Sequence, residues 1–236
     1  MYLDPCDSVI SKSLFLYKTW EPFVSYLFCQ NISKGDIVVD IGAHIGWYSL
    51  LASLIVGKQG IIYAFEPEPR TFTILLLNIK LNDIKNIIPI NKALSDSSGY
   101  ESLFLNLYNE YPSIYQMWPT SDGESILVET VTFNEYFKNK HIDVIKIDAE
   151  GYEVKIFRGA EQILSRNPKL IIFSEFWPEG LRGAGTSPEE YIDLVSKHGF
   201  NIQIIKNGRL KRISNKEVLN LDKSSNFLLT HSCTHT

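Results

Sequence analysis

The chain has 236 residues, of which 44% are hydrophobic and 21% are charged, and its formal net charge is −4. This length suits one α/β domain with a substantial core and leaves little room for two domains of ordinary size. The acidic balance disfavours a nucleic-acid backbone as the main partner, because such proteins carry a basic excess or patch. A short basic cluster is interpreted as a solvated turn; it contains Lys206, Arg209, Lys211 and Arg212.

The three cysteines are widely spaced in the chain, at Cys6, Cys29 and Cys233. Their spacing fits neither a zinc site nor a disulfide framework, so we expect a reduced protein in the cytoplasm. The first residues lack the basic and apolar regions of a secretory signal. No apolar run is long enough to span a bilayer, and no membrane partner is expected.

The first segment, residues 8–31, is rich in aromatic side chains and is interrupted by Pro22. We expect one or two short helices here, and we place a helical cap at residues 1–33 ahead of the main domain at residues 34–236. Most of these aromatics are expected to pack in the core or cover an active site. If the helices expose them instead, they offer an apolar patch for a homodimer.

Strand and helix patterns alternate after this segment. Short runs rich in β-branched residues predict seven strands, at residues 36–41, 60–65, 86–91, 142–147, 170–176, 200–206 and 226–231. Helices are predicted between them, at residues 46–56, 69–82, 153–165 and 187–198. The alternation predicts a doubly wound, mostly parallel α/β sheet with right-handed crossovers.

The segment 97–132 interrupts the alternation with glycines, prolines and scattered aromatics. We expect two strands there, joined by a long loop. Long loops in compact domains are often functional, so residues 109–123 are a candidate for a lid that faces the substrate. Four aromatics near or within this loop suit stacking on a sugar ring: Tyr108, Tyr111, Tyr115 and Trp118.

The strongest functional signal is the turn between the first strand and the first helix of the sheet, Asp40-Ile41-Gly42-Ala43-His44-Ile45-Gly46. Gly42 permits torsions that other residues avoid and lets a ligand approach the main chain. The helix that begins at Gly46 offers unpaired N–H groups and a positive dipole end, which suit a carboxylate. Asp40 can attract an ammonium group. The turn therefore predicts a ligand that contains an amino acid.

An acidic residue, Glu66, follows the second strand about 20 residues after the glycine turn. In doubly wound folds a carboxylate at this point accepts hydrogen bonds from ribose hydroxyls. The glycine pattern here is G-x-x-x-G rather than the dinucleotide pattern G-x-G-x-x-G, and His44 would crowd a pyrophosphate. The two motifs together favour S-adenosylmethionine, an adenosyl amino acid, over a nicotinamide dinucleotide.

Four segments carry a family resemblance: Asp40-Ile41-Gly42-Ala43-His44-Ile45-Gly46, Phe65-Glu66-Pro67, Ala93-Leu94-Ser95-Asp96 and Ile147-Asp148-Ala149-Glu150-Gly151-Tyr152-Glu153. From about residue 34 to 205 the chain resembles the FkbM family of class I S-adenosylmethionine-dependent methyltransferases. The resemblance implies a Rossmann-like sheet with an antiparallel last strand. It also implies methyl transfer, usually to oxygen, with sugars and secondary metabolites as acceptors. The family often has Asn where this chain has His44, which leaves the role of His44 open.

The strand ends and the resemblance together define the expected site. Expected cofactor contacts are Asp40, Gly42, Ala43, His44, Gly46, Glu66, Pro67, Ala93, Leu94 and Asp148. The candidate catalytic residues are Asp148, Glu150, Glu175 and His44. The expected partner is a small-molecule or glycan acceptor.

Five carboxylates follow strand ends and are expected to share one rim of the sheet: Asp40, Glu66, Asp148, Glu150 and Glu175. Carboxylates in one cleft raise one another's pKa and can supply a base near neutrality. We expect Asp148 or Glu150 to take or orient the acceptor's proton, with Glu175 opposite and His44 as the other candidate base. Glu150 has an alternative interpretation as the cap of the next helix, and Glu153 is expected to be structural.

Asp148 and Glu175 could hold Mg²⁺ through oxygen ligands, but the local spacing does not demand a metal, and none is predicted. Two other functions stay open, namely a nucleotide-dependent Rossmann oxidoreductase and a cofactor-binding module without catalysis. A nucleic-acid amino-methyltransferase is disfavoured, because the Asn/Asp-Pro-Pro-Tyr segment of those enzymes is absent.

Overall fold

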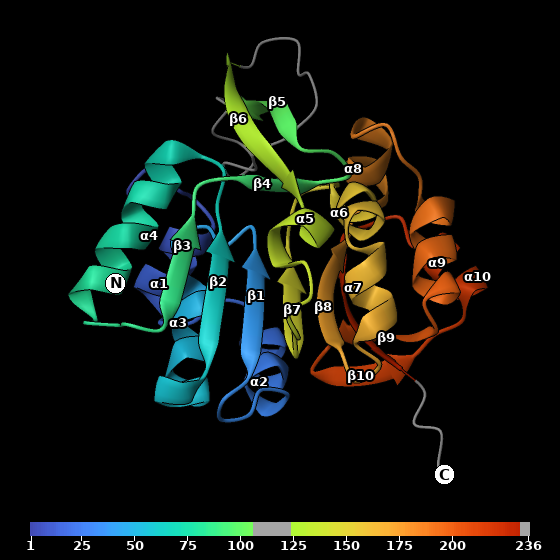
Figure 1. Cartoon of the computed structure of the whole chain (residues 1–236), viewed down its shortest axis with the longest axis horizontal. Helices are drawn as coiled ribbons and strands as arrows, with labels where there is room; N and C mark the ends of the chain where they lie inside the picture. Colours follow the sequence, from blue (N-terminus) through green and yellow to red (C-terminus); the bar gives the residue numbers. More distant parts are fainter. Residues whose placement is uncertain (106–123, 232–236) are drawn as a thin grey trace.

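The computed structural model describes residues 1–105 and 124–231. Eight strands of the described residues form the main sheet: β1 (Ile37–Ile41), β2 (Ile61–Phe65), β3 (Ile87–Ile90), β7 (Val144–Ile147), β8 (Ile171–Phe176), β9 (Phe200–Lys206), β10 (Arg209–Arg212) and β11 (Ser225–His231). Their order across the sheet is β10-β9-β11-β8-β7-β1-β2-β3. β1, β2, β3, β7 and β8 pair in parallel, so their carboxyl ends share one edge (Figure 1).

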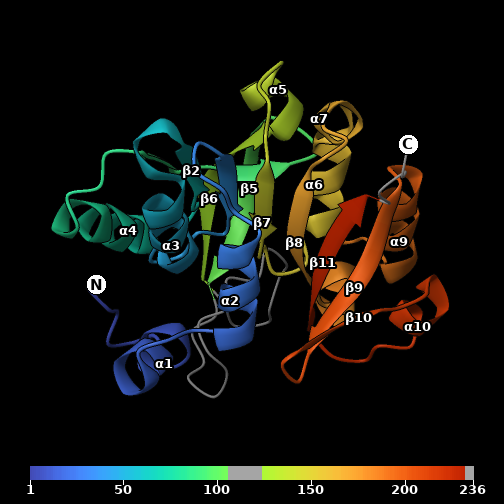
Figure 2. The ribbon, with the colours of Figure 1, turned by 90° about the horizontal axis from the view of Figure 1, so that it is seen from below.

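Helices cover both faces of this sheet (Figure 2). One face carries α1 (Ile10–Tyr17), α2 (Pro22–Gln30), α3 (Trp47–Val56) and α4 (Pro69–Leu81). The other carries α5 (Phe133–Phe137), α6 (Glu153–Gly159), α7 (Glu161–Arg166) and α9 (Pro188–Lys197). The remaining helices are η1 (Gly57–Gln59), α8 (Pro178–Gly183) and α10 (Asn215–Leu219). This arrangement confirms the doubly wound α/β fold.

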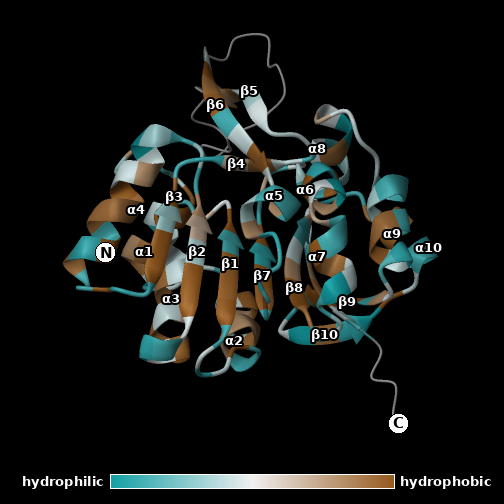
Figure 3. Ribbon diagram, viewed as in Figure 1, coloured by the Kyte–Doolittle hydropathy of each residue, from teal (hydrophilic) through white to brown (hydrophobic). Residues whose placement is uncertain are grey.

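Side-chain alternation along the central strands divides the core in two. Val39 and Ile41 pack in the cluster beneath α6 and α9, whereas Val38 packs in the cluster beneath α2 and α3. Because both faces of these strands are buried, the strands are apolar along most of their length (Figure 3). The same alternation places Asp40 on the α3 side, where Ser49 hydrogen-bonds to it.

A second, three-stranded sheet stands over the carboxyl ends of the main strands (Figure 1). It is made of β4 (Ala93–Ser95), β5 (Gly99–Leu105) and β6 (Glu124–Thr132), in the order β4-β6-β5. β5 and β6 are antiparallel, which confirms the two strands predicted between residues 97 and 132. The lid predicted at residues 109–123 lies outside the described residues.

The seven predicted strands are all present, and β11 runs antiparallel to both of its neighbours, β8 and β9. The basic cluster, however, is not a solvated turn. Arg209–Arg212 form the exposed edge strand β10, which pairs antiparallel with β9. The turn itself is Asn207-Gly208, with both residues at positive φ, as a two-residue hairpin requires. An edge strand needs no buried face, so its sequence shows no apolar alternation.

The helix predicted at residues 153–165 is interrupted at Ala160, between α6 and α7. Just before it, the backbone at Gly159 runs so close to β4 that a Cβ there would lie 2.1 Å from the Ser95 carbonyl oxygen. The start of α9 confirms its predicted cap, since the Ser187 hydroxyl accepts the N–H of Glu190. Within the described part of the chain, no helix is long and apolar enough to cross a membrane.

The N-terminal segment forms two short helices, α1 and α2. Phe28 of α2 is fully buried and meets Tyr48 and Phe173 edge-on, so α2 shares the core of the sheet. Other aromatics do not follow the expectation of core packing. Phe15 and Tyr17 of α1 are exposed to 65% and 72%.

Candidate active site

A cavity of about 440 Å³ lies at the carboxyl ends of β1, β2, β7 and β8. Its size is within the range of small-molecule sites. Toward β2 and β3 its wall contains Glu66 together with apolar residues, namely Phe65, Pro67, Ala93 and Leu94. Toward β7 and β8 the wall is acidic, with Asp148, Glu150 and Glu175. The N-terminal segment completes it with Asp7, Val9, Ile10, Trp20 and Glu21.

Four N–H groups of the glycine turn after β1 are already hydrogen-bonded within the protein. Gly42 and Ala43 both donate to the Phe65 carbonyl oxygen, at 3.0 and 2.9 Å. The N–H of His44 donates to Glu66, and the N–H of Gly46 donates to the Ala43 carbonyl oxygen. The unpaired N–H groups were expected at the start of the helix that begins at Gly46; the N–H of Gly46 itself is paired, so this residue offers none to a carboxylate.

Gly42 has the unusual torsion that was predicted for it, and it also has a second role. Its φ is +76°, and a Cβ at this position would lie 1.9 Å from the carbonyl oxygen of Asp148. A side chain there would push the end of β7 away from the turn. Gly42 thus permits close approach of backbone to backbone, and this approach sets Asp148 beside the turn.

Glu66 is nine-tenths or more buried and lines the cavity. Each carboxylate oxygen accepts one backbone N–H, from Glu68 at 2.9 Å and from His44 at 2.8 Å. Burial raises the pKa of Glu66 to about 8, against the lowering effect of these two bonds. Each oxygen keeps acceptor capacity for a further donor. The two backbone bonds fix the position of the Glu66 side chain, which can then accept hydrogen bonds from hydroxyl groups of a ligand.

Three of the predicted cofactor contacts lie behind the cavity wall. Asp40 is 1% exposed, and its Oδ2 accepts the hydroxyl of Ser49 at 2.6 Å. Burial raises its pKa to about 6. Ala43 and Gly46 are buried and do not line the cavity either. The contacts that do line it are Gly42, His44, Glu66, Pro67, Ala93, Leu94 and Asp148.

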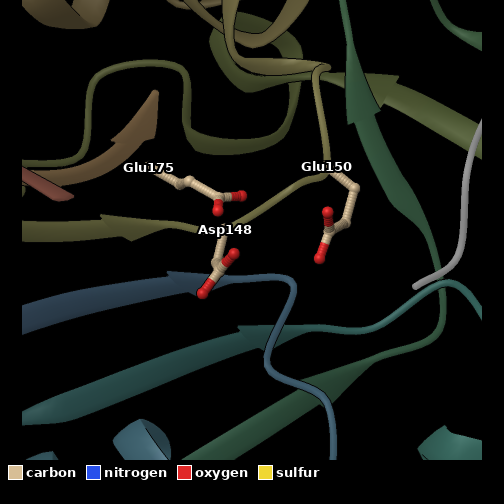
Figure 4. A group of neighbouring side chains, drawn as sticks. All are labelled: Asp148, Glu150 and Glu175. Carbon is tan, nitrogen blue, oxygen red and sulfur yellow. The ribbon is translucent and has the colours of Figure 1, made fainter. Parts of the chain in front are cut away.

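The predicted catalytic carboxylates come together (Figure 4). Asp148 follows β7, Glu150 lies in the turn before α6, and Glu175 belongs to β8; their nearest oxygens all lie within 4.8 Å of one another. Burial, followed by repulsion from Asp148, raises the pKa values of Glu150 and Glu175 well above their ordinary range. α6 has no side-chain capping bond at its start, so the interpretation of Glu150 as a helix cap is wrong.

Glu153 supports the turn that carries Glu150. Its side chain is fully buried, and Oε1 accepts the N–H groups of Ala149 and Gly151 at 3.2 and 3.4 Å. Gly151 is at positive φ and runs against the backbone of Gly180. These contacts agree with a structural role for Glu153.

His44 lines the cavity with the carboxylates. Its Nδ1 is buried and has no hydrogen-bond partner among the described residues. Burial lowers the pKa of the imidazole, against the attraction of nearby carboxylates such as Asp7. The ring is therefore neutral at neutral pH and can accept a proton.

Lys146 is a site residue that sequence reasoning missed. It is completely buried in β7, and its Nζ donates to Oδ2 of Asp148 at 2.9 Å. It also lies 5.0 Å from the ring centroid of Tyr48. Burial alone would lower its pKa, but the attraction of Asp148, Glu21 and Glu175 together with the bond to Asp148 raises the pKa overall, so the amine stays charged. The signal was a lone lysine in the apolar run Val144-Ile145-Lys146-Ile147.

Glu21 was also missed, because nothing local marks it. One of its oxygens accepts the hydroxyl of Tyr48 at 2.6 Å, and the other accepts the amide of Asn226 at 2.6 Å. It thereby joins the N-terminal segment to α3 and β11 at the cavity wall. Only the folded chain brings these three segments together.

The small sheet is tied to the site through Tyr152, which lines the cavity. The Tyr152 hydroxyl donates to Glu101 of β5 at 2.8 Å, and Glu101 also accepts the hydroxyl of Ser95 at 2.7 Å. The position of the small sheet over the cavity thus depends partly on a side chain next to Glu150 and Glu153.

The sheet order and the antiparallel β11 define the fold of the class I S-adenosylmethionine-dependent methyltransferases. The Methyltransferase FkbM domain matches residues 40–202, and the chain belongs to this family. The residues around the cavity fit the cofactor, since Glu66 can receive ribose hydroxyls beside the apolar wall of Pro67, Ala93 and Leu94.

Individual relatives are distant. The hexuronic acid methyltransferase AglP of Haloferax volcanii is 25% identical over 193 residues, which cover 80% of this chain and 73% of that protein. The 31-O-demethyl-FK506 methyltransferase FkbM of Streptomyces tacrolimicus is 24% identical over 168 residues, covering 68% and 62%. A solved S-adenosylmethionine-dependent O-methyltransferase of Thermotoga maritima shares the fold, with a TM-score of 0.54, 11% identity, and coverage of 97% and 73%.

Proposed function

We propose that this methyltransferase methylates a hydroxyl oxygen of a small acceptor, a sugar or a secondary metabolite. The observation that carries the proposal is one cavity shared by Glu66 and the three carboxylates Asp148, Glu150 and Glu175. The names of AglP and of the Streptomyces FkbM enzyme, which refer to a hexuronic acid and to an O-demethylated metabolite, support it.

The two ends of the cavity have different roles in this proposal. Glu66 accepts the ribose hydroxyls, and Pro67, Ala93 and Leu94 contact the adenine. S-adenosylmethionine supplies an activated methyl group, so the protein mainly positions the acceptor, which can contribute about 7–11 kcal/mol to lowering the barrier. Asp40, Ala43 and Gly46 shape the turn from behind the wall.

Proton removal is assigned to the acidic end of the cavity. The ammonium group of Lys146 donates a hydrogen bond to Asp148 and holds its carboxylate in place. Asp148 is therefore positioned to orient the acceptor hydroxyl. Within the described residues no bond engages Glu150, so it is free to take the proton as the oxygen is methylated. His44 is the other group on the wall that can accept it. A general base of this kind contributes about 10²–10⁴-fold.

The test is product analysis with a panel of hydroxylated acceptors that includes hexuronic acids, polyols and a macrolide. Mass spectrometry detects the added methyl group, and NMR locates the atom that carries it. We expect a methyl ether, with turnover falling about 10²-fold or more in Glu150→Gln or His44→Ala. A methyl group on nitrogen or carbon would contradict the proposal. Normal turnover in both variants would contradict the base assignment.

A further inference from the structure

Asp148 and Glu150, from the loop between β7 and α6, and Glu175, from β8, reach the same point (Figure 4). Each offers one carboxylate oxygen, and these oxygens lie within 4.8 Å of one another. Oxygens bonded to Ca²⁺ at about 2.3–2.6 Å lie at most about 4.6–5.2 Å apart, when they stand on opposite sides of the ion. The three oxygens are therefore near the spacing that one bound ion requires, and rotation of the side chains can close the remaining distance.

The cluster also leaves acceptor atoms unused. Oε2 of Glu175 is out of contact with solvent and has no hydrogen-bond partner within the described residues, while its Oε1 accepts the hydroxyl of Ser224. Glu150 points toward Asp148 (Figure 4), and no bond in the described part of the chain engages it. Buried carboxylate oxygens are normally paired, so Oε2 of Glu175 indicates a missing partner.

Charge indicates what that partner is. Among the described residues, Lys146 is the cation that contacts the cluster, and it bonds Asp148 alone. Three ionised carboxylates and one ammonium group leave two negative charges in a largely buried site. Such an excess is costly unless a cation or protons neutralise it. One divalent cation balances it.

We propose that Asp148, Glu150 and Glu175 form a binding site for a hard divalent cation, Ca²⁺, Mg²⁺ or Mn²⁺. An all-oxygen set of carboxylates suits these ions. The sequence allows Asp148 and Glu175 as Mg²⁺ ligands but predicts no metal; Glu150 joins them only in the folded chain, where it lies beside Glu175 from 25 residues earlier. The remaining coordination positions face the cavity, where water fills them or, given the proposed function, an acceptor oxygen replaces it.

The experiment is calorimetric titration of the chelator-treated, full-length protein with CaCl₂, MgCl₂ and MnCl₂ in turn, with Mn²⁺ binding also followed by electron paramagnetic resonance. We expect saturable binding of one ion per chain. Glu150→Gln and Glu175→Gln should each weaken binding by about tenfold or more, since even the loss of an indirect partner costs that much at metal sites. The matched control, Glu189→Gln on the exposed start of α9, should bind as the natural chain does.

Glutamine keeps the shape of the side chain and removes its charge, so both variants should fold and melt no lower than the natural chain without metal. Absence of saturable binding of all three ions up to about 10 mM, beyond the weakest protein sites, would overturn the inference. So would unchanged affinity in both variants. Binding of S-adenosylhomocysteine in the presence of chelator separates this failure from failure of the proposed function.

Discussion

The two acidic ends of the cavity differ in how their carboxylates are satisfied. Glu66 accepts a backbone N–H at each oxygen, so its position is fixed before any ligand arrives. At the other end Oε2 of Glu175 has no partner among the described residues, and Lys146 pairs with Asp148 alone of the three carboxylates. A carboxylate with a fixed position is suited to binding the cofactor, whereas a cluster of carboxylates with an unpaired oxygen is suited to proton transfer from the acceptor. Under the proposed function, Glu66 therefore marks a holding end and the three carboxylates mark a reacting end, along one row of strand ends.

The largest effect is expected from Lys146→Met, which removes the cation from the reacting end. Asp148, whose side chain is 29% exposed, would lose its ion pair with the fully buried Lys146, and breaking a buried pair costs up to about 3–5 kcal/mol. Denaturant unfolding followed by circular dichroism measures this loss. In the control Lys155→Met, which breaks a partly exposed pair with Glu101, the loss should be about 1 kcal/mol or less. Equal losses would mean that Lys146 has no special role.

Gly42→Ala should disrupt the contact that joins the two ends. The new Cβ would lie 1.9 Å from the Asp148 carbonyl oxygen, in addition to strain at positive φ, so we expect a loss of about 3 kcal/mol. Gly35→Ala is the matched control, because Gly35 also has positive φ but open space around its Cβ position. It should lose only about 1–2 kcal/mol. The two unfolding midpoints are compared directly, and equal shifts would refute the close-approach argument.

Asp40→Asn should stabilise the protein, and the gain should depend on pH. Asp40 has a raised pKa of about 6 in the folded chain and an ordinary value of 3.8, so the folded state keeps a proton that the unfolded state loses. Stability is then lost as pH rises through this range, and Asn avoids the loss while still accepting the Ser49 hydroxyl. We expect a gain of about 1–3 kcal/mol above pH 6 and little below pH 4.

Unfolding free energies measured from pH 4 to 8 test this prediction. The charged groups that act on Asp40 are Lys146 and Asp148, and both are unchanged in the variant. Asp193→Asn, at an exposed position of α9, should show no such dependence. A variant at Asp40 that is less stable than the natural chain at pH 8 would show that the ionised carboxylate is needed there.

The smallest effect is expected from Tyr152→Phe, which removes the hydroxyl that bonds to Glu101. One hydrogen bond between the small sheet and the reacting end is lost, at about 0.5–1.5 kcal/mol. Thermal unfolding should show a modest fall in Tm. Tyr100→Phe, at a residue 68% exposed on β5, should leave Tm unchanged. A large fall for Tyr152→Phe would mean that the small sheet depends on this bond more than we propose.

Much of the fold could be predicted because short runs of β-branched residues such as Ile37–Ile41 are stable mainly as buried parallel strands. β10 was not predicted, although the dipeptide Asn207-Gly208 is a strong hairpin signal, because its charged strand lacks apolar alternation. The position of the acidic rim was predictable from strand ends.

The direction of each side chain was less predictable. Asp40 stands at a strand end but faces Ser49 on α3, because alternation along β1 turns it away from the cavity. Lys146 and Glu21 join the site only through contacts between distant segments. The satisfied N–H groups of the glycine turn follow from the pairing of β1 with β2, since Phe65 supplies the acceptor for Gly42 and Ala43.

The most direct test of the division between the two ends is the affinity for S-adenosylhomocysteine, measured by calorimetry for the natural chain, Glu66→Ala and Glu150→Gln. Glu66 is expected to hydrogen-bond both ribose hydroxyls, at about 0.5–1.5 kcal/mol for each bond, so Glu66→Ala should weaken binding by about tenfold or more. Glu150→Gln should change it by less than about threefold. Full affinity in Glu66→Ala, or a large loss in Glu150→Gln, would contradict the assignment of holding and reacting ends.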